Sequence, residues 1–270
     1  MNGVDRTSGL IAVDGVDRMC SPGSMDRMGG WGAMNGVNHT GGLVAVDGAD
    51  RAFDWAAFLQ PIWLSVKVSF IASLLVMALG IWTAHRIGGR RFFGKTLLET
   101  TLLLPLVLPP TVVGFLLLVL LGRRSWVGRL WEWWFDRTVI FHWHAAVIAA
   151  VVVAFPLVYQ TLKAGFASVS GEVKDAARLD GAGEWQLLFR IVLPLSARSL
   201  ATAYVLGFAR ALGEFGATLM VAGNIPGRTR TIPTAIYAAV ETNQWQLAGL
   251  WSAVLVCIAF ALLLATRPRE

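Results

Sequence analysis

Five stretches of the chain are apolar and long enough to cross a lipid bilayer as helices, because a spanning helix needs about 20 residues. They cover residues 61–84, 97–121, 143–162, 191–212 and 245–266, and more polar segments separate them. The pattern predicts an all-α integral membrane protein with five transmembrane helices.

Some of these stretches carry residues that interrupt a simple apolar helix. Lys67 lies near one end of the first stretch, where its stem can snorkel to the lipid headgroups. Pro105, Pro109 and Pro110 fall within the second stretch, and Pro156 falls within the third. Proline removes a helical hydrogen bond, so we expect a kink or a locally unwound segment in the second stretch.

Composition supports a membrane protein. Charged residues make up 15% of the chain, against about 25% in soluble domains. The formal net charge is +6, but the basic residues cluster in loops, as membrane orientation requires. They form no basic face with interleaved aromatic residues, so a nucleic-acid partner is not expected.

Basic residues in short loops indicate the orientation. If the loop after the first stretch is cytoplasmic, ten Lys and Arg face the cytoplasm and seven face the other side. The ten are Arg86, Arg90, Arg91, Lys95, Lys163, Lys174, Arg178, Arg190, Arg267 and Arg269, and the seven are Arg51, Arg123, Arg124, Arg129, Arg137, Arg228 and Arg230. We therefore expect the N-terminus outside, the C-terminus inside and segment 163–190 in the cytoplasm.

Residues 1–54 differ from the rest of the chain. They hold 11 of the 28 Gly and contain neither Lys nor Glu. Residues 2–18 and 35–51 agree at 12 of 17 positions, but about three repeats are needed to bury a solenoid core. We expect a disordered N-terminal extension ahead of a transmembrane domain over residues 55–270. A duplicated upstream segment, with translation starting at an internal Met such as Met34, is the alternative.

A polar segment between the third and fourth stretches has the pattern of a helix, a turn and a helix. Ser170 can cap the first helix, and Gly181 can end it in the left-handed conformation. Val173, Ala176 and Ala177 then form a small apolar face. Small side chains on such a face would let the groove of another protein approach the backbone closely.

The second helix of this segment is expected from about Glu184. Helical spacing puts Trp185, Leu188 and Phe189 on one face. Pro194 would start the fourth span, where the missing N–H costs little. The segment would then be continuous with a membrane helix, and movement of a docked partner would pass directly into that helix.

The same segment resembles the loop by which permease subunits of ABC importers contact their ATPase. The pattern there is Glu-Ala-Ala, three residues, Gly, nine residues and Ile-x-Leu-Pro. The matching residues here are Ala176, Ala177, Gly181, Ile191, Leu193 and Pro194, with Asp175 where Glu is usual. The resemblance implies an ATPase-coupling loop with a cytoplasmic coupling helix between spans three and four.

Three further runs are similar to the permease of molybdate ABC importers, namely Leu104–Gly114, Phe208–Thr218 and Gly223–Tyr237. Permeases for sulfate and tungstate share parts of them. The likeness covers about residues 55–266 and implies a type I importer permease in the bacterial inner membrane that translocates molybdate by alternating access. It also implies a homodimer with a path at the subunit interface, a cytoplasmic ABC ATPase dimer and an external oxyanion-binding protein.

Six residues are candidates for the translocation path or its gate. Arg210 and Glu214 are four apart, so they share a helix face, and ionisable residues at membrane depth are functional candidates. A neutralising pair that stabilises the helix end or a dimer contact is the alternative. The other four are Pro109, Pro110, Thr111 and Gly114, because irregular backbone survives where it faces a cavity; a packing kink is the alternative.

Two regions are expected on the outer side. Residues 213–237 are too polar for a simple span, and we expect them to cover the path. The loop 122–142 places Trp126, Leu130, Trp133 and Trp134 on one helical face. This face is typical of an interfacial helix in the aromatic belt, and a contact for the binding protein is the alternative.

Other functional classes fit less well. A membrane-embedded enzyme would need an intramembrane set of carboxylates, His pairs or a nucleophile with its base, which the stretches lack. His142 and His144 point to different helix faces, so no metal site is expected, and Glu99 is expected to be an interfacial residue. The chain has no Gly-x-x-x-x-Gly-Lys-Ser/Thr loop, so ATP and Mg²⁺ would belong to the partner. A self-contained channel would not need the docking segment.

Overall fold

The computed structural model describes residues 54–88, 93–136 and 138–265. Apart from Asp54, the expected extension at residues 1–54 lies outside these ranges, as do Arg90, Arg91, Arg137, Arg267 and Arg269 of the charge count. Asp54 itself caps the first helix, because its Oδ1 accepts hydrogen bonds from the N–H groups of Ala56 and Ala57 at 3.0 and 3.1 Å.

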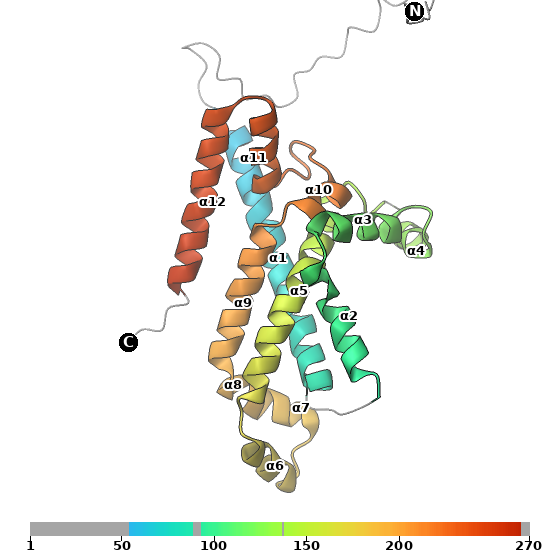
Figure 1. Ribbon diagram of the computed structural model, residues 1–270, viewed down its shortest axis with the longest axis vertical. Helices are drawn as coiled ribbons and strands as arrows, with labels where there is room; N and C mark the ends of the chain where they lie inside the picture. Colours follow the sequence, from blue (N-terminus) through green and yellow to red (C-terminus); the bar gives the residue numbers. More distant parts are fainter. Residues whose placement is uncertain (1–53, 89–92, 137, 266–270) are drawn as a thin grey trace, which may run out of the picture. The chain divides into compact units, whose positions relative to one another are not determined.

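All the regular structure in the described residues is helical, as predicted (Figure 1). The elements are α1 (Trp55–Gly88), α2 (Lys95–Val107), α3 (Pro110–Leu121), α4 (Trp126–Phe135), α5 (Trp143–Ala167), α6 (Gly171–Leu179), α7 (Glu184–Leu187), the π-helical turn η2 (Leu188–Val192), α8 (Leu193–Leu195), α9 (Ala197–Leu212), α10 (Gly216–Ala222), α11 (Ile232–Glu241) and α12 (Trp245–Ala265).

Three of these helices, α1, α5 and α12, are each long and apolar enough to cross a membrane. Two bent pairs qualify only when each pair is counted as one span. They are α2 with α3, which meet at 114°, and residues 184–195 with α9, which meet at 81°. Length and composition therefore allow three to five spans, and the predicted five is the upper end of that range.

Two of the helices run beyond the predicted apolar limits. The first begins six residues earlier, at Trp55, and α5 continues to Ala167. Helical hydrogen bonding continues through polar residues, which an apolar-length criterion does not count. Lys67 consequently lies well inside α1, and its ammonium sits over the ring of Trp143, 4.1 Å from the centroid.

The interruption predicted in the second stretch is present, and it is a sharp bend. Pro105 stays inside α2, whereas Leu108 and Pro109 are extended, with ψ of 141° and 136°. The ring of a proline pushes the preceding residue out of the helical region. The chain therefore leaves α2 at Leu108 and restarts as α3 at Pro110.

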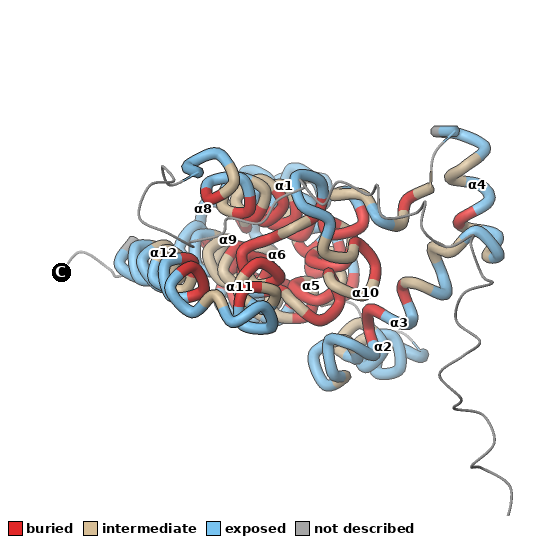
Figure 2. Tube along the Cα trace, turned by 90° about the horizontal axis from the view of Figure 1, so that it is seen from above, coloured by how far each residue is buried: buried red, intermediate tan, exposed pale blue. Residues whose placement is uncertain are grey.

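A core of small side chains joins α1, α5 and α9. Ala72, Ala145, Ala149 and Ala154 are fully buried, and a Cβ added at Gly80 would lie 2.9 Å from Leu162 Cδ1. Small residues let helix backbones approach closely, which is how membrane helices pack where lipid is as apolar as leucine. Figure 2 shows the buried positions gathered on α5 and its neighbours, with α12 largely exposed.

The two ends of α5 carry different structures (Figure 1). Segments α6 to α8 follow its C-terminal end, whereas α10 packs near its N-terminal end and also against α3. With 25 residues and about 1.5 Å per residue, α5 separates the two ends by about 36 Å.

Candidate functional site

The polar segment between α5 and α9 contains α6 and α7, and we call it the α6–α7 segment. Its first helix, α6, begins and ends as predicted. The Ser170 side chain accepts a hydrogen bond from the N–H of Val173, which is an N-cap. At the other end Gly181 has φ +85°, and the N–H of Ala182 donates to the carbonyl of Ala177 at 3.0 Å. With the bond from Gly181 N–H to the Arg178 carbonyl, this is a Schellman motif, which fixes the direction of the turn.

The exposed face of α6 differs from the predicted one. Ala177 is 8% exposed and belongs to the core cluster that also contains Leu187 and Leu188, so its place on a docking face was predicted wrongly. The Schellman turn folds the end of α6 back, so that Ala177 meets Ala182. Asp175 and Ala176 are exposed as expected. Leu179, which the sequence reasoning missed, is 89% exposed.

Arg178 links the two helices of the segment. Its Nη1 lies 2.9 Å from Asp175 Oδ1, and its Nε lies 3.1 Å from Glu184 Oε1. The hydrogen bond to Glu184 raises the pKa of the Arg178 guanidinium above its usual value. Exposed pairs of this kind contribute about 0–1 kcal/mol each, so they orient Asp175 more than they stabilise the fold.

The second helix is short and changes its helical type. After the four residues of α7, the chain makes the π-helical turn η2. Trp185 and Phe189 are exposed and their rings stack with centroids 6.0 Å apart, whereas Leu188 is fully buried. The prediction that Leu188 shares their face was wrong, because a π-helical turn has more residues per turn than the α-helical spacing assumed.

The Ile-x-Leu-Pro run, residues 191–194, lies at the junction with α9. Ile191 and Leu193 pack partly buried against the core cluster, and Pro194 is exposed at the start of α8. The chain then bends by 81° at Ser196, whose Oγ donates to the Val192 carbonyl at 2.5 Å. Direct continuity with the fourth span was therefore predicted wrongly, since this span restarts at Ala197.

A second connection joins the segment to α1. The ring of Trp185 lies 6.0 Å from that of His85, and the guanidinium carbon of Arg86 lies 5.8 Å from the same indole. A cavity of about 340 Å³ between the segment and the ends of α1 and α5 is lined by residues that include Lys163 and Lys174. The Lys174 ammonium donates to the Phe166 carbonyl at 2.8 Å, and burial lowers the pKa of this amine.

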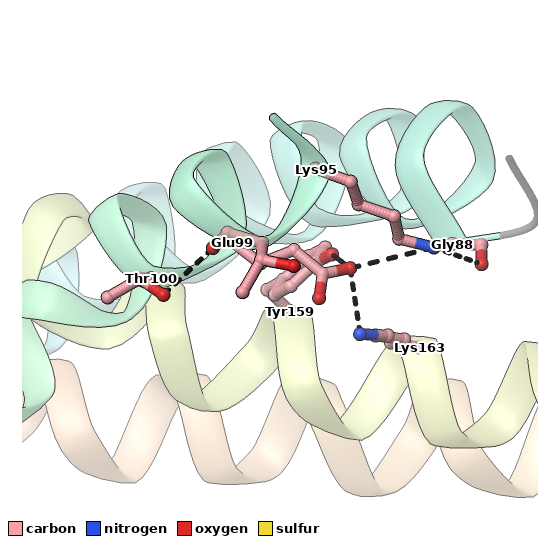
Figure 3. A network of polar contacts seen from close by, with 7 residues as sticks. Gly88, Lys95, Glu99, Thr100, Tyr159 and Lys163 are labelled. Carbon is pink, nitrogen blue, oxygen red and sulfur yellow. Dashed lines mark hydrogen bonds and ion pairs between the residues drawn. The ribbon is translucent and has the colours of Figure 1, made fainter. Parts of the chain in front are cut away.

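Near this cavity a polar network fastens α2 to α5 (Figure 3). Glu99 accepts from Lys163 Nζ at 2.8 Å and from the Tyr159 hydroxyl at 3.2 Å, and Lys95 Nζ lies 3.9 Å away. The three partners converge on one carboxylate oxygen, and the Glu99 side chain is 19% exposed. The sequence predicted Glu99 as an interfacial residue but did not indicate its partners. Lys163 lies 64 positions further along the chain, so no local pattern connects the two residues.

The Arg210–Glu214 pair forms at the far end of α9. Arg210 Nη1 lies 2.7 Å from Glu214 Oε2, and the Glu214 side chain is 2% exposed. The other carboxylate oxygen accepts a hydrogen bond from the N–H of Ala217 in α10 at 2.9 Å. This geometry is that of a neutralising pair that also ties α9 to α10, and a role in gating stays a prediction.

The broken span packs directly on α10. A Cβ added at Gly114 would lie 2.7 Å from the Ala217 Cα, and one at Gly216 would lie 3.2 Å from Pro110 and Thr111. The structure therefore brings Pro110, Thr111 and Gly114 beside the Glu214 turn. Gly114 is buried in this helix contact, which fits the packing alternative. Pro109, Pro110 and Thr111 are exposed and stay candidates for the path.

The Trp-rich face of α4 is exposed as the interfacial interpretation requires. Its members are Trp126, Leu130, Trp133 and Trp134, which are 54–79% exposed. Within the described residues no group of three or more His, Cys, Asp or Glu could hold a metal ion.

Residues 76–267 match the family described as "Binding-protein-dependent transport system inner membrane component". The chain belongs to this family, and its apolar helices make it a multi-pass membrane protein.

Relatives within the family are similar along most of their length. The chain is 50% identical over 213 residues to the "Putative molybdenum transport system permease protein YvgM" of Bacillus subtilis (strain 168), covering 79% of this chain and 94% of the relative. It is 44% identical over 205 residues to the "Molybdenum transport system permease protein ModB" of Escherichia coli (strain K12), covering 76% and 89%. A "Sulfate transport system permease protein CysW" of Synechococcus elongatus is 34% identical, with 70% and 65% covered.

The fold is shared with solved transporters. The chain resembles a subunit of a bacterial ABC transporter involved in the import of the acidic polysaccharide alginate, with a TM-score of 0.63 at 18% identity and coverage of 78% of this chain and 77% of that chain. At this identity the likeness concerns the fold alone.

Proposed function

We propose that this chain is the membrane-spanning permease subunit of an ATP-driven ABC importer for molybdate. The observation that carries the proposal is the α6–α7 segment, in which a Schellman turn and Arg178 present Asp175, Ala176 and Leu179 to the surroundings. Trp185 and Phe189 add an exposed aromatic pair. Such a rigid, partly apolar projection is suited to docking into a groove of an ATPase.

The partners follow from the same proposal. Two copies of this chain would form the path, a dimer of a separate ATPase would bind ATP and Mg²⁺, and an external binding protein would deliver the oxyanion. The chain itself is then a transport subunit without a catalytic site. It would lie in the bacterial inner membrane with five spans, its N-terminus outside and the α6–α7 segment in the cytoplasm.

Similarity to two molybdenum permeases at 50% and 44% identity supports molybdate over sulfate, for which the relative is 34% identical. Tungstate is a tetrahedral dianion of similar size and stays an alternative within the same class. A self-contained channel or a membrane-embedded enzyme is a weaker alternative, because neither class needs a docking segment.

Uptake by a reconstituted complex tests this proposal. The chain is placed in liposomes together with its ATPase and its binding protein, and accumulation of radioactive molybdate is followed with and without ATP. We expect saturable, ATP-dependent uptake that tungstate inhibits and excess sulfate does not. Sulfate uptake unaffected by molybdate would overturn the substrate, and uptake that persists with an ATPase-dead partner would overturn the importer class.

A further inference from the structure

A second cavity lies at the other end of α1 and α5 from the α6–α7 segment. It has a volume of about 490 Å³, within the range of about 300–1,000 Å³ typical of ligand pockets. Three separate parts of the chain line it: Gln60 and Lys67 come from α1, His142 and Trp143 from the start of α5, and Arg228 and Arg230 from the loop between α10 and α11.

The α10–α11 loop is held in one conformation. The Ile225 carbonyl accepts hydrogen bonds from the N–H groups of Arg228, Thr229 and Arg230 at 3.0–3.2 Å. Thr229, which is fully buried, accepts in turn from the N–H of Ile225 at 3.0 Å. A loop with these internal bonds presents the two arginines from a rigid base.

The same loop is fastened to the α1 wall of the cavity. The N–H of Ile232 donates to Ser65 Oγ at 2.7 Å. At Gly227, whose φ is +76°, a Cβ would lie only 3.0 Å from Gln60 Nε2. The loop that carries Arg228 and Arg230 therefore contacts α1, the helix that carries Lys67, on the wall of this open cavity.

The charges on this cavity are all of one sign. Lys67, Arg228 and Arg230 line it, and no Asp or Glu does. None of the three has an ion-pair partner among the described residues. Arg230 Nε donates to Asn224 Oδ1 at 2.9 Å, and burial lowers the pKa of its guanidinium. Arg228 is exposed, whereas Lys67 and Arg230 are half-buried. Like charges that line one cavity repel one another, and a bound anion reduces that cost.

We propose that this cavity, between Lys67, Arg228 and Arg230, is a binding site for a tetrahedral oxyanion. Arginine forks donate paired hydrogen bonds to such oxygens and lysine supplies a compact charge. His142 and Gln60 add further polar groups to the wall. The choice of molybdate as the free ligand rests on the proposed function. The phosphate of an anionic lipid has the same chemistry, so the test separates the two sources.

Binding can be measured without transport. The full-length chain with its ATPase, but without the binding protein, is placed in phosphatidylcholine nanodiscs and titrated with radioactive molybdate. We expect saturable binding that tungstate competes for and that weakens as salt rises. Arg228→Gln and Arg230→Gln should each raise the dissociation constant about tenfold or more, the effect of losing a hydrogen bond to a charged group. Lys67→Gln tests the opposite wall if an arginine variant does not fold.

Arg124→Gln is the matched control, because Arg124 is exposed and does not line the cavity. It should leave the dissociation constant within about twofold. Repeating the titration in nanodiscs that contain phosphatidylglycerol distinguishes free molybdate from lipid phosphate as the ligand. If lipid phosphate occupies the site, molybdate should bind more weakly in these nanodiscs. Phosphatidylglycerol should then co-purify with the parent chain and be lost from the Arg228→Gln variant.

Two results would overturn the site. One is that neither molybdate nor phosphatidylglycerol binds in a way that depends on Arg228, Arg230 or Lys67. The other is that the substitutions at Arg228, Arg230 and Lys67 leave oxyanion binding unchanged and weaken only the association with the oxyanion-free binding protein. The edge of the cavity would then be a contact surface for that protein. Because the assay needs no uptake, failed transport by the parent complex would count against the proposed function and leave the binding result standing.

Discussion

Among single residues, Gly181 is the one whose backbone conformation decides the geometry of the α6–α7 segment. Its φ is +85° and a Cβ there would meet no atom within 4 Å, so a side chain is disfavoured by the backbone conformation and not by lack of space. A left-handed conformation costs an L-residue roughly 1–2 kcal/mol, and a β-branched residue tolerates it least.

We expect Gly181→Val to break the Schellman turn and weaken ATPase binding while membrane insertion stays normal. The measurement is co-purification of the ATPase with the tagged permease, together with uptake. Gly183→Val is the control, because Gly183 has φ −67° and open space around its Cβ position. A Gly181→Val complex that purifies whole and transports normally would show that the segment is not the docking site.

Glu214 is a residue whose structural and functional roles can be separated. Replacing it with Ala leaves Arg210 and the Ala217 N–H without their partner, which should cost about 1–3 kcal/mol. We expect a lower thermal transition for the purified complex. Glu132→Ala should shift the transition much less, because its partner Arg123 is exposed and such pairs contribute about 0–1 kcal/mol.

The Gln variant distinguishes the two interpretations of Glu214. Its amide oxygen can keep the hydrogen bond from Ala217 while the charge is lost. Near-normal stability with lost uptake would indicate a role in the path. Reduced stability with normal uptake per folded complex would leave Glu214 as a structural tie between α9 and α10.

At the scale of elements, the Glu99 network decides how α2 stands against α5. Hydrogen bonds to a charged group contribute about 1.5–3 kcal/mol, and Glu99 receives them from both Lys163 and Tyr159. We expect Glu99→Ala to loosen α2, seen as faster amide hydrogen exchange in peptides of residues 95–107. Thr100→Val is the control, because the Thr100 hydroxyl bonds only within its own helix. Unchanged exchange in Glu99→Ala would show that apolar packing alone holds α2.

The connection between the α6–α7 segment and the membrane helices also belongs to this scale. The segment reaches α9 through a bend and a π-helical turn, and it reaches α1 through Trp185 with His85 and Arg86. Movement of a docked partner would thus be shared between two helices. Trp185→Ala should reduce the uptake obtained per ATP hydrolysed more than it reduces ATPase binding, and an equal loss of both would assign Trp185 to docking alone.

For the whole molecule, the expected orientation places Leu179 in the cytoplasm and Arg124 outside. In a chain with Cys20→Ser and Cys257→Ser, Leu179→Cys and Arg124→Cys are single labelling sites on residues that are exposed. A membrane-impermeant maleimide added to intact spheroplasts should label only Arg124→Cys, and lysis should make Leu179→Cys reactive. The reverse pattern would invert the topology, and labelling of both positions on one side would contradict five spans.

Sequence alone was sufficient for several features that depend on local chemistry. Apolar runs indicated the helices, and paired prolines indicated the break before Pro110. Ser170 and Gly181 marked the limits of α6, because capping depends on residues within one turn. The spacing around Gly181 and Pro194 was also enough to show the resemblance to importer permeases.

The tertiary structure decided what depends on partners far along the chain. Ala177 and Leu188 turned out to be buried, Leu179 exposed, and the fourth span bent at Ser196, because packing against α1 and α5 and a π-helical turn override regular helical spacing. Lys163 donates to Glu99, and Lys67 lines the same cavity as Arg228 and Arg230. Folding brings together these side chains, which are 64 to 163 positions apart in the sequence. No local pattern encodes such contacts, since each depends on how separate helices cross.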